Sequence, residues 1–85
     1  MERIKEIADH FGLKNQTIKT IEECLELVKA LCLNDKENTI EEIADVTIMI
    51  KQLTYLLDIE KEVDDMIKFK IDRTMRRYNI WKSSN

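Results

Sequence analysis

The chain has 85 residues, of which 44% are hydrophobic and 36% are charged, with one Gly and no Pro. This length makes one small domain, residues 1–85, in which we expect residues 78–85 to fray. Its net charge of −3 argues against a general nucleic-acid binder. It has no apolar run long enough to span a membrane and no signal-peptide pattern, so we expect a cytoplasmic protein.

The scarcity of Gly, Pro and aromatic residues favours an all-α fold. Apolar spacing predicts four helices, over residues 2–11, 16–33, 40–57 and 60–78. Gly12 is the expected stop of the first helix, and Asp58 stands where a Gly would be expected after the third. Apolar residues are too abundant for so few helices to bury, so we expect a second copy of the chain to complete the core.

Two acidic clusters lie on consecutive predicted helices. Glu23 and Glu26 share one helical face, and Glu42 and Asp45 share another. The polar connection at residues 34–38 is short enough to fold the two helices antiparallel. Four carboxylates would then converge, which is the ligand set that a hard cation such as Mg²⁺ requires.

Each cluster also has a simpler interpretation. Glu42 fits a capping box with Thr39, in which its side chain reaches back to the Thr39 amide. That leaves Asp45 unexplained, on a helix that is apolar nearly all around and is therefore expected to be central. Glu23 and Glu26 lie to one side of the apolar arc of their helix, so taken alone they fit a solvated helix face.

The predicted fourth helix is basic toward its C-terminus, where Lys70, Arg73 and Arg77 share one face. These cations either complement the helix dipole or hold phosphate oxygens. Cys24 and Cys32 are too far apart on one helix for a disulfide, and we expect both as buried free thiols. The single histidine, His10, is interpreted as a residue at the end of the first helix and not as a metal ligand.

The pattern Glu22-Glu23-x-x-Glu26, followed by Glu42-x-x-Asp45, resembles the signature of the MazG-like all-α nucleoside triphosphate pyrophosphohydrolases. The likeness runs from about residue 16 to residue 77 and includes Lys70-Ile71-Asp72-Arg73. The resemblance implies a four-helix chain that assembles into a dimer or tetramer. It also implies Mg²⁺-dependent cleavage of an NTP or dNTP between its α- and β-phosphates, giving a monophosphate and pyrophosphate.

The resemblance further assigns roles to individual residues. The implied ligands of Mg²⁺, or of Mn²⁺ in its place, are Glu23, Glu26, Glu42 and Asp45. On chemical grounds, a carboxylate that is not fully engaged with the metal, Glu22 or Glu23, would be the catalytic residue that orients the attacking water or accepts its proton. The implied phosphate-binding residues are Lys70, Arg73 and Arg77.

Two other classes of function fit parts of the sequence. The spacing of Ala8, Gly12 and Ile18 mimics a helix-turn-helix DNA-binding module in which Gln16 begins the recognition helix. That helix would carry Glu22, Glu23 and Glu26 toward a phosphate backbone, which is unfavourable. A non-catalytic helical bundle that serves only for interaction is the remaining alternative, with both acidic clusters as solvated faces.

Overall fold

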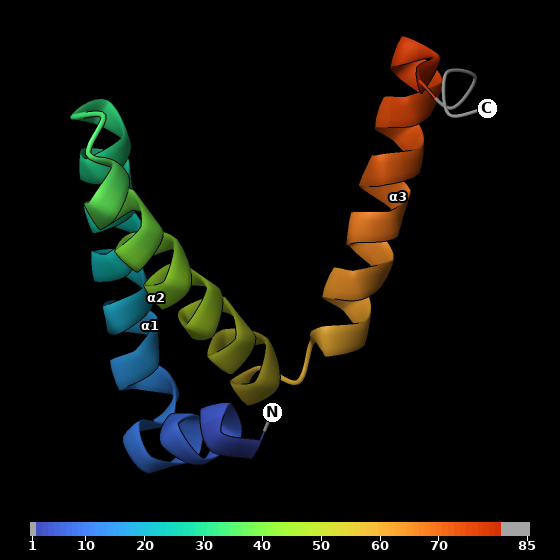
Figure 1. Cartoon of the computed structure of the whole chain (residues 1–85). Coiled ribbons are helices and arrows are strands. Elements are labelled where there is room, and N and C mark those ends of the chain that lie inside the picture. The colour runs from blue at the N-terminus through green and yellow to red at the C-terminus, as the bar shows by residue number, and fades with distance from the viewer. Residues whose placement is uncertain (1, 81–85) are drawn as a thin grey trace.

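Three helices make up nearly all of the part of the chain that the computed structural model describes, residues 2–80 (Figure 1). They are α1 (Glu2–Cys32), α2 (Lys36–Leu56) and α3 (Glu60–Tyr78). The prediction of an all-helical fold is confirmed, since residues 2–80 contain no strand. None of these helices is long and apolar enough to cross a membrane. The expected fraying concerns residues 78–85, of which 81–85 lie outside the described range.

The expected first and second helices are two arms of one element, α1. Gly12 has non-helical torsions (φ 83°, ψ 166°), yet helical structure continues directly on both sides of it. The chain therefore changes direction without a loop, and the number of helices is three instead of the four predicted (Figure 1). A positive φ costs Gly little, whereas it would strain a residue with a side chain.

The turn between α1 and α2 is shorter than predicted. Asn34 adopts a left-handed conformation (φ 56°), and the amides of Asn34 and Asp35 donate to the carbonyls of Leu31 and Ala30, which is the Schellman arrangement. Asp35 then caps α2 by accepting from the Asn38 amide over 3.1 Å. The helix thus begins at Lys36 and not near residue 40.

The capping box between Thr39 and Glu42 is therefore not formed. Thr39 lies inside α2, and its amide donates to the Asp35 carbonyl over 2.9 Å. Because that amide is already satisfied, Glu42 has no capping role and its side chain is free for another one.

The turn between α2 and α3 repeats the Schellman arrangement with an aspartate. Asp58 has φ 56°, its amide donates to Tyr55, and the Ile59 amide donates to Thr54. After Gly, Asn and Asp are the residues that most readily adopt this left-handed conformation. The predicted fourth helix corresponds to α3 with the same bounds, 60–78.

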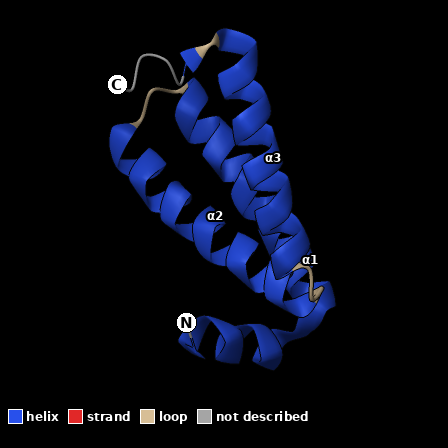
Figure 2. Ribbon diagram, turned by 90° about the vertical axis from the view of Figure 1, so that its right-hand side faces the viewer, coloured by secondary structure: helices blue, strands red, loops and turns tan. Residues whose placement is uncertain are grey.

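The antiparallel pair of α1 and α2 forms the only packed unit of the described chain, with α3 standing away from it (Figures 1 and 2). The apolar core between α1 and α2 is small and consists of Ala8, Ala30, Val46 and Met49. The short N-terminal arm of α1 is tied to the end of α2, because the Tyr55 hydroxyl donates to the Asp9 carboxylate over 2.8–2.9 Å. None of the α3 side chains is buried.

Large apolar side chains remain exposed on every helix of the described chain. On α1, Leu25 is 64% exposed, and on α2 even the expected central helix leaves Ile43 and Ile50 about half exposed. The expectation of buried thiols is wrong for the single chain, since Cys24 and Cys32 are free and exposed. Both lie on the apolar side of α1, which α2 does not cover. Completion of the core by a second copy stays a prediction.

Candidate functional site: a carboxylate cluster beside a cavity

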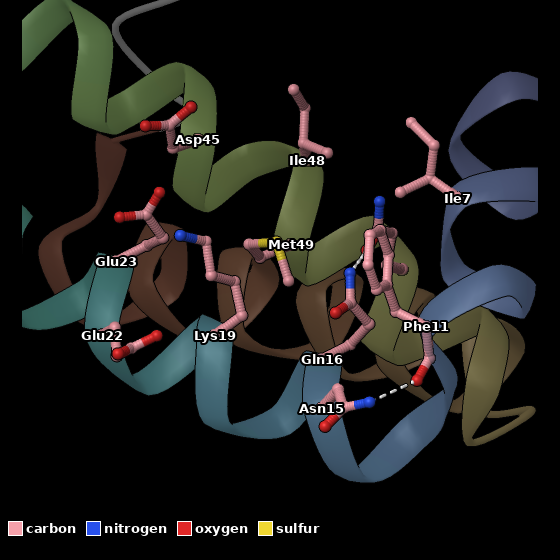
Figure 3. A pocket seen from close by; sticks show the side chains of 11 residues that line it. Ile7, Phe11, Asn15, Gln16, Lys19, Glu22, Glu23, Asp45, Ile48 and Met49 are labelled. Atoms are coloured by element: carbon pink, nitrogen blue, oxygen red, sulfur yellow. Dashed lines mark hydrogen bonds between the residues drawn. The ribbon is translucent and has the colours of Figure 1, made fainter.

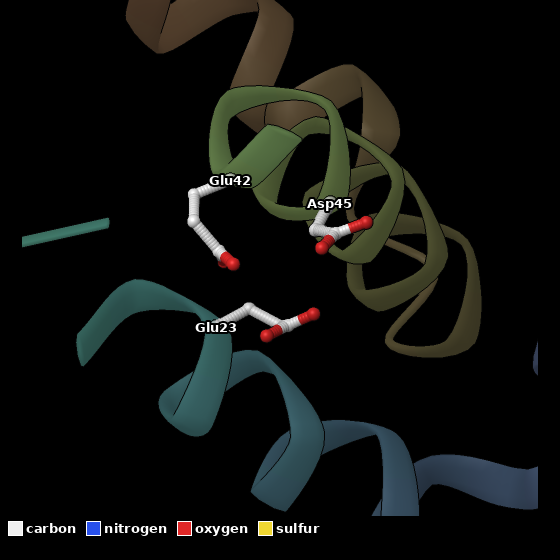
Figure 4. A group of neighbouring side chains, drawn as sticks. All are labelled: Glu23, Glu42 and Asp45. Atoms are coloured by element: carbon white, nitrogen blue, oxygen red, sulfur yellow. The ribbon is translucent and has the colours of Figure 1, made fainter. Parts of the chain in front are cut away.

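Three of the predicted carboxylates meet between α1 and α2 (Figure 4). Glu23 comes from α1, and Glu42 and Asp45 come from successive turns of α2. One oxygen from each lies within 4.8 Å of the others. The antiparallel turn at residues 33–35 brings them together, because it sets α1 and α2 face to face with a fixed register.

The cluster is electrostatically unfavourable for three negative charges. Partial burial, followed by the charge of Glu42, raises the pKa of Glu23 above its usual 4.5. Partial burial, followed by the charge of Asp45, raises the pKa of Glu42 in the same way. Glu23 and Glu42 thus resist ionisation because water is partly excluded and their neighbours are acidic.

The donor set suits a hard divalent cation. Glu42 Oε2 is buried and has no hydrogen-bond partner among the described residues. A buried polar atom without a partner lowers the stability of the fold unless a hydrogen bond, an opposite charge or a metal ion compensates it. Mg²⁺ holds oxygens at about 2.0–2.1 Å, so ligands on opposite sides of it are about 4 Å apart. The three oxygens lie within 4.8 Å of one another, so small side-chain movements would bring all three onto one ion.

The other two predicted acidic residues lie on either side of the cluster. Glu26 is exposed and lines a smaller pocket with Glu42 and Lys29. Its charge still raises the pKa of Glu42. Glu22 is also exposed, and it lines the main cavity beside Glu23. Three of the four predicted ligands therefore lie close together and Glu26 is adjacent, and the ligand set itself stays a prediction.

The main cavity opens directly beside the carboxylates and has a volume of about 430 Å³ (Figure 3). Its acidic end is formed by Glu22, Glu23 and Asp45. Its opposite end is apolar and includes Ile7 and Phe11 from the short arm of α1. The bend at Gly12 places this arm across the end of the cavity, so a ligand there would meet charge at one end and apolar surface at the other.

Sequence reasoning did not assign several residues of this cavity to the site. Lys19 lines it one turn before Glu23, and Phe11 and Ile7 wall its far end. The spacing Lys19–Glu23 was the available signal for the lysine. No comparable signal existed for the two apolar residues, because their position depends on the direction that the chain takes at Gly12.

The predicted phosphate-binding residues are not brought to this site within one chain. Lys70, Arg73 and Arg77 lie on α3, which makes no packing contact with α1 (Figure 1). The Arg73 guanidinium lies over the Phe69 ring of its own helix, 5.8 Å from the centroid. Any contact with the carboxylate cluster would have to involve another copy of the chain.

The segment proposed as a recognition helix is partly occupied by the packing of α1 on α2. Gln16 and Thr20 are buried, and Gln16 Nε2 donates to Gln52 Oε1 over 2.6 Å. A residue fixed in this way is not available to a base edge in a DNA groove. His10 stacks edge-on against Phe11 at 4.7 Å and is not part of the carboxylate cluster.

Comparison of the chain with protein-family models, with characterised proteins and with solved structures found no match.

Proposed function

We propose that the protein is a divalent-cation-dependent nucleotide pyrophosphohydrolase that converts an NTP or dNTP to a monophosphate and pyrophosphate. The observation that carries the proposal is the meeting of Glu23, Glu42 and Asp45 beside a cavity with an apolar far end. The choice of the α–β phosphate bond comes from the resemblance of the acidic motifs to the MazG-like family.

Glu23, Glu42 and Asp45 would hold Mg²⁺, or Mn²⁺ in its place, with Glu26 as a fourth candidate ligand. The cation supplies positive charge for the triphosphate oxygens and makes water a better nucleophile. The raised pKa values of Glu23 and Glu42 fit this role, because a cation would relieve the repulsion that raises them.

Glu22 is the best candidate for handling the proton of the attacking water. It lines the cavity beside Glu23 but is not one of the three close carboxylates. A carboxylate placed in this way can orient water and accept its proton. Glu23 could also orient this water and accept its proton through the carboxylate oxygen that does not bind the cation.

The cavity would take the nucleoside, and α3 would supply cations for the departing pyrophosphate. Phe11 offers an aromatic ring at the apolar end, where a base can stack. Lys70, Arg73 and Arg77 would act on the carboxylate site of another copy in a homodimer or tetramer, since they lie far from the site of their own chain.

The proposal is tested with a panel of standard and modified nucleotides in the presence of Mg²⁺, with pyrophosphate and orthophosphate measured separately. We expect pyrophosphate and a nucleoside monophosphate in equal amounts, and no turnover by Glu42→Gln. Release of orthophosphate alone would refute the assigned bond. Absence of turnover, together with unchanged Mg²⁺ binding by Glu42→Gln, would favour a non-catalytic helical bundle.

A further inference from the structure

Lys19 occupies the boundary between the two ends of the main cavity. It is the one basic side chain among the described residues that line this cavity. Its side chain lies beside Met49 and extends toward the end that holds Glu23 and Asp45 (Figure 3). A ligand with a phosphate near the carboxylates and an apolar part near Phe11 would pass this ammonium group.

The charge of Lys19 acts on both helices of the carboxylate cluster. It lowers the pKa of Glu23 on α1 and that of Glu42 on α2, opposing the larger effects that raise them. The ammonium group is therefore close enough to both carboxylates for its field to matter.

Lys19 nevertheless forms no ion pair within 4.0 Å in the described part of the chain. A comparison is available on α3, where Lys61 precedes Asp65 by the same four residues and closes on it at 2.7 Å. The Lys19–Glu23 pair has equivalent spacing but stays open. The ammonium thus keeps donors for another acceptor inside the cavity.

Building on the proposed function, we infer that Lys19 binds a phosphate group of the substrate, next to the cation, within the same chain. A Lys is a point charge with three donors and suits a phosphate oxygen. A bound cation at Glu23, Glu42 and Asp45 would repel the ammonium group, and an anionic phosphate between the two would reverse that repulsion. Lys19 would then contribute to substrate binding while opposing binding of the cation alone.

These two opposite effects define the experiment, which uses inorganic triphosphate with excess Mg²⁺ as one probe and Mn²⁺ alone as the other. In Lys19→Met we expect triphosphate to bind about tenfold more weakly, as for loss of a charged hydrogen bond. Mn²⁺ alone should bind as tightly as to the wild type or more tightly. Lys19→Arg should retain most triphosphate binding.

Lys14→Met is the matched control, since Lys14 is exposed on the same arm of α1 and does not line the cavity. It should change neither affinity. Equal triphosphate binding by Lys19→Met and wild type would overturn this inference but not the proposed function. Parallel loss of triphosphate and Mn²⁺ binding would also overturn it, because Lys19 would then maintain the arrangement of the carboxylates instead of binding phosphate. A wild-type protein that binds neither probe would overturn the proposed function as well.

Discussion

Gln16 and Gln52 form a buried hydrogen bond that sets the register of the carboxylate cluster. Gln16 Nε2 donates to Gln52 Oε1 over 2.6 Å, and Gln52 is only 1% exposed. Glu23 follows Gln16 by seven residues on α1, and Asp45 precedes Gln52 by seven on α2. Because the helices are antiparallel, the two pairs lie about two turns, or about 10 Å, apart on the same interface.

The glutamine pair should therefore affect both stability and the site. Gln52→Ala leaves the Gln16 amide buried without its partner, and should cost about 1–3 kcal/mol in the free energy of unfolding. The double variant Gln16→Leu with Gln52→Leu should recover most of that loss, since it removes both polar groups. Urea unfolding of the wild type, Gln52→Ala, Gln16→Leu, Gln52→Leu and the double Leu variant measures the loss and the coupling. Purely additive effects would contradict a specific pairing.

Mg²⁺ should stabilise the folded protein. Binding to the folded state alone raises the free energy of unfolding by about 2.7 kcal/mol at one hundred times the Kd. The rise in Tm should vanish in Glu42→Gln and Asp45→Asn, and Asp45→Asn should stabilise the metal-free protein by relieving repulsion. Glu26→Gln should weaken the effect less, because Glu26 lies outside the three-carboxylate group.

Glu41→Gln provides the control for these variants. Glu41 is exposed next to Glu42 and loses the same charge when substituted, but is not one of the three clustered residues. It should keep most of the Mg²⁺-dependent rise in Tm. An equal loss in Glu41→Gln and Glu42→Gln would indicate a diffuse charge effect instead of coordination.

The metal-free protein should lose stability as the pH rises above the usual carboxyl pKa of 4.5. Glu23 and Glu42 have raised pKa values in the folded state, so the folded protein binds their protons more tightly than the unfolded chain does. Their stabilising contribution is full below 4.5 and is lost as the pH passes the raised values. Glu42→Gln removes one of these groups. The Tm of Glu42→Gln should exceed that of the wild type by a margin that grows from pH 4 to pH 7. A constant difference in Tm would exclude a raised pKa of Glu42 in the folded protein.

The protein should form a dimer or tetramer at micromolar concentration, measured by light scattering. The α3 helix has no buried residue, and its apolar positions include Ile67 and Ile71, each about half exposed. In proteins, most of the stability of a helix comes from packing of its apolar face and not from intrinsic helix propensity. Ile71→Asp should therefore dissociate the assembly and lower the helical signal in circular dichroism.

Lys61→Asp is the control for that variant, since it introduces the same side chain at an exposed position of α3 and removes the Lys61–Asp65 ion pair but no apolar side chain. It should leave the mass in solution unchanged. A stable wild-type monomer at micromolar concentration would refute the predicted assembly. It would also remove the route by which Lys70, Arg73 and Arg77 reach a carboxylate cluster.

The sequence alone determined the helical class and the bounds of α3, because the scarcity of Gly and Pro and a spacing of four residues are local properties. It also predicted that Glu23, Glu42 and Asp45 would approach one another, since spacing within a helix and a short turn are visible in the chain. The start of α2 was missed because the Asp35 side chain caps the helix earlier, at the Asn38 amide, and the Asp35 carbonyl accepts from the Thr39 amide on which the capping box depended.

The tertiary structure decided which side chains surround the carboxylates. The torsions at Gly12 turn the short arm of α1 so that Phe11 lines the far end of the cavity that Lys19 also lines. The Gln16–Gln52 bond fixes how far α1 slides along α2, and thus leaves Glu26 outside the cluster. The tertiary structure also leaves Cys24 exposed, since α2 covers only one side of α1. Direction at a bend and register between helices depend on contacts distant in sequence, which local periodicity does not encode.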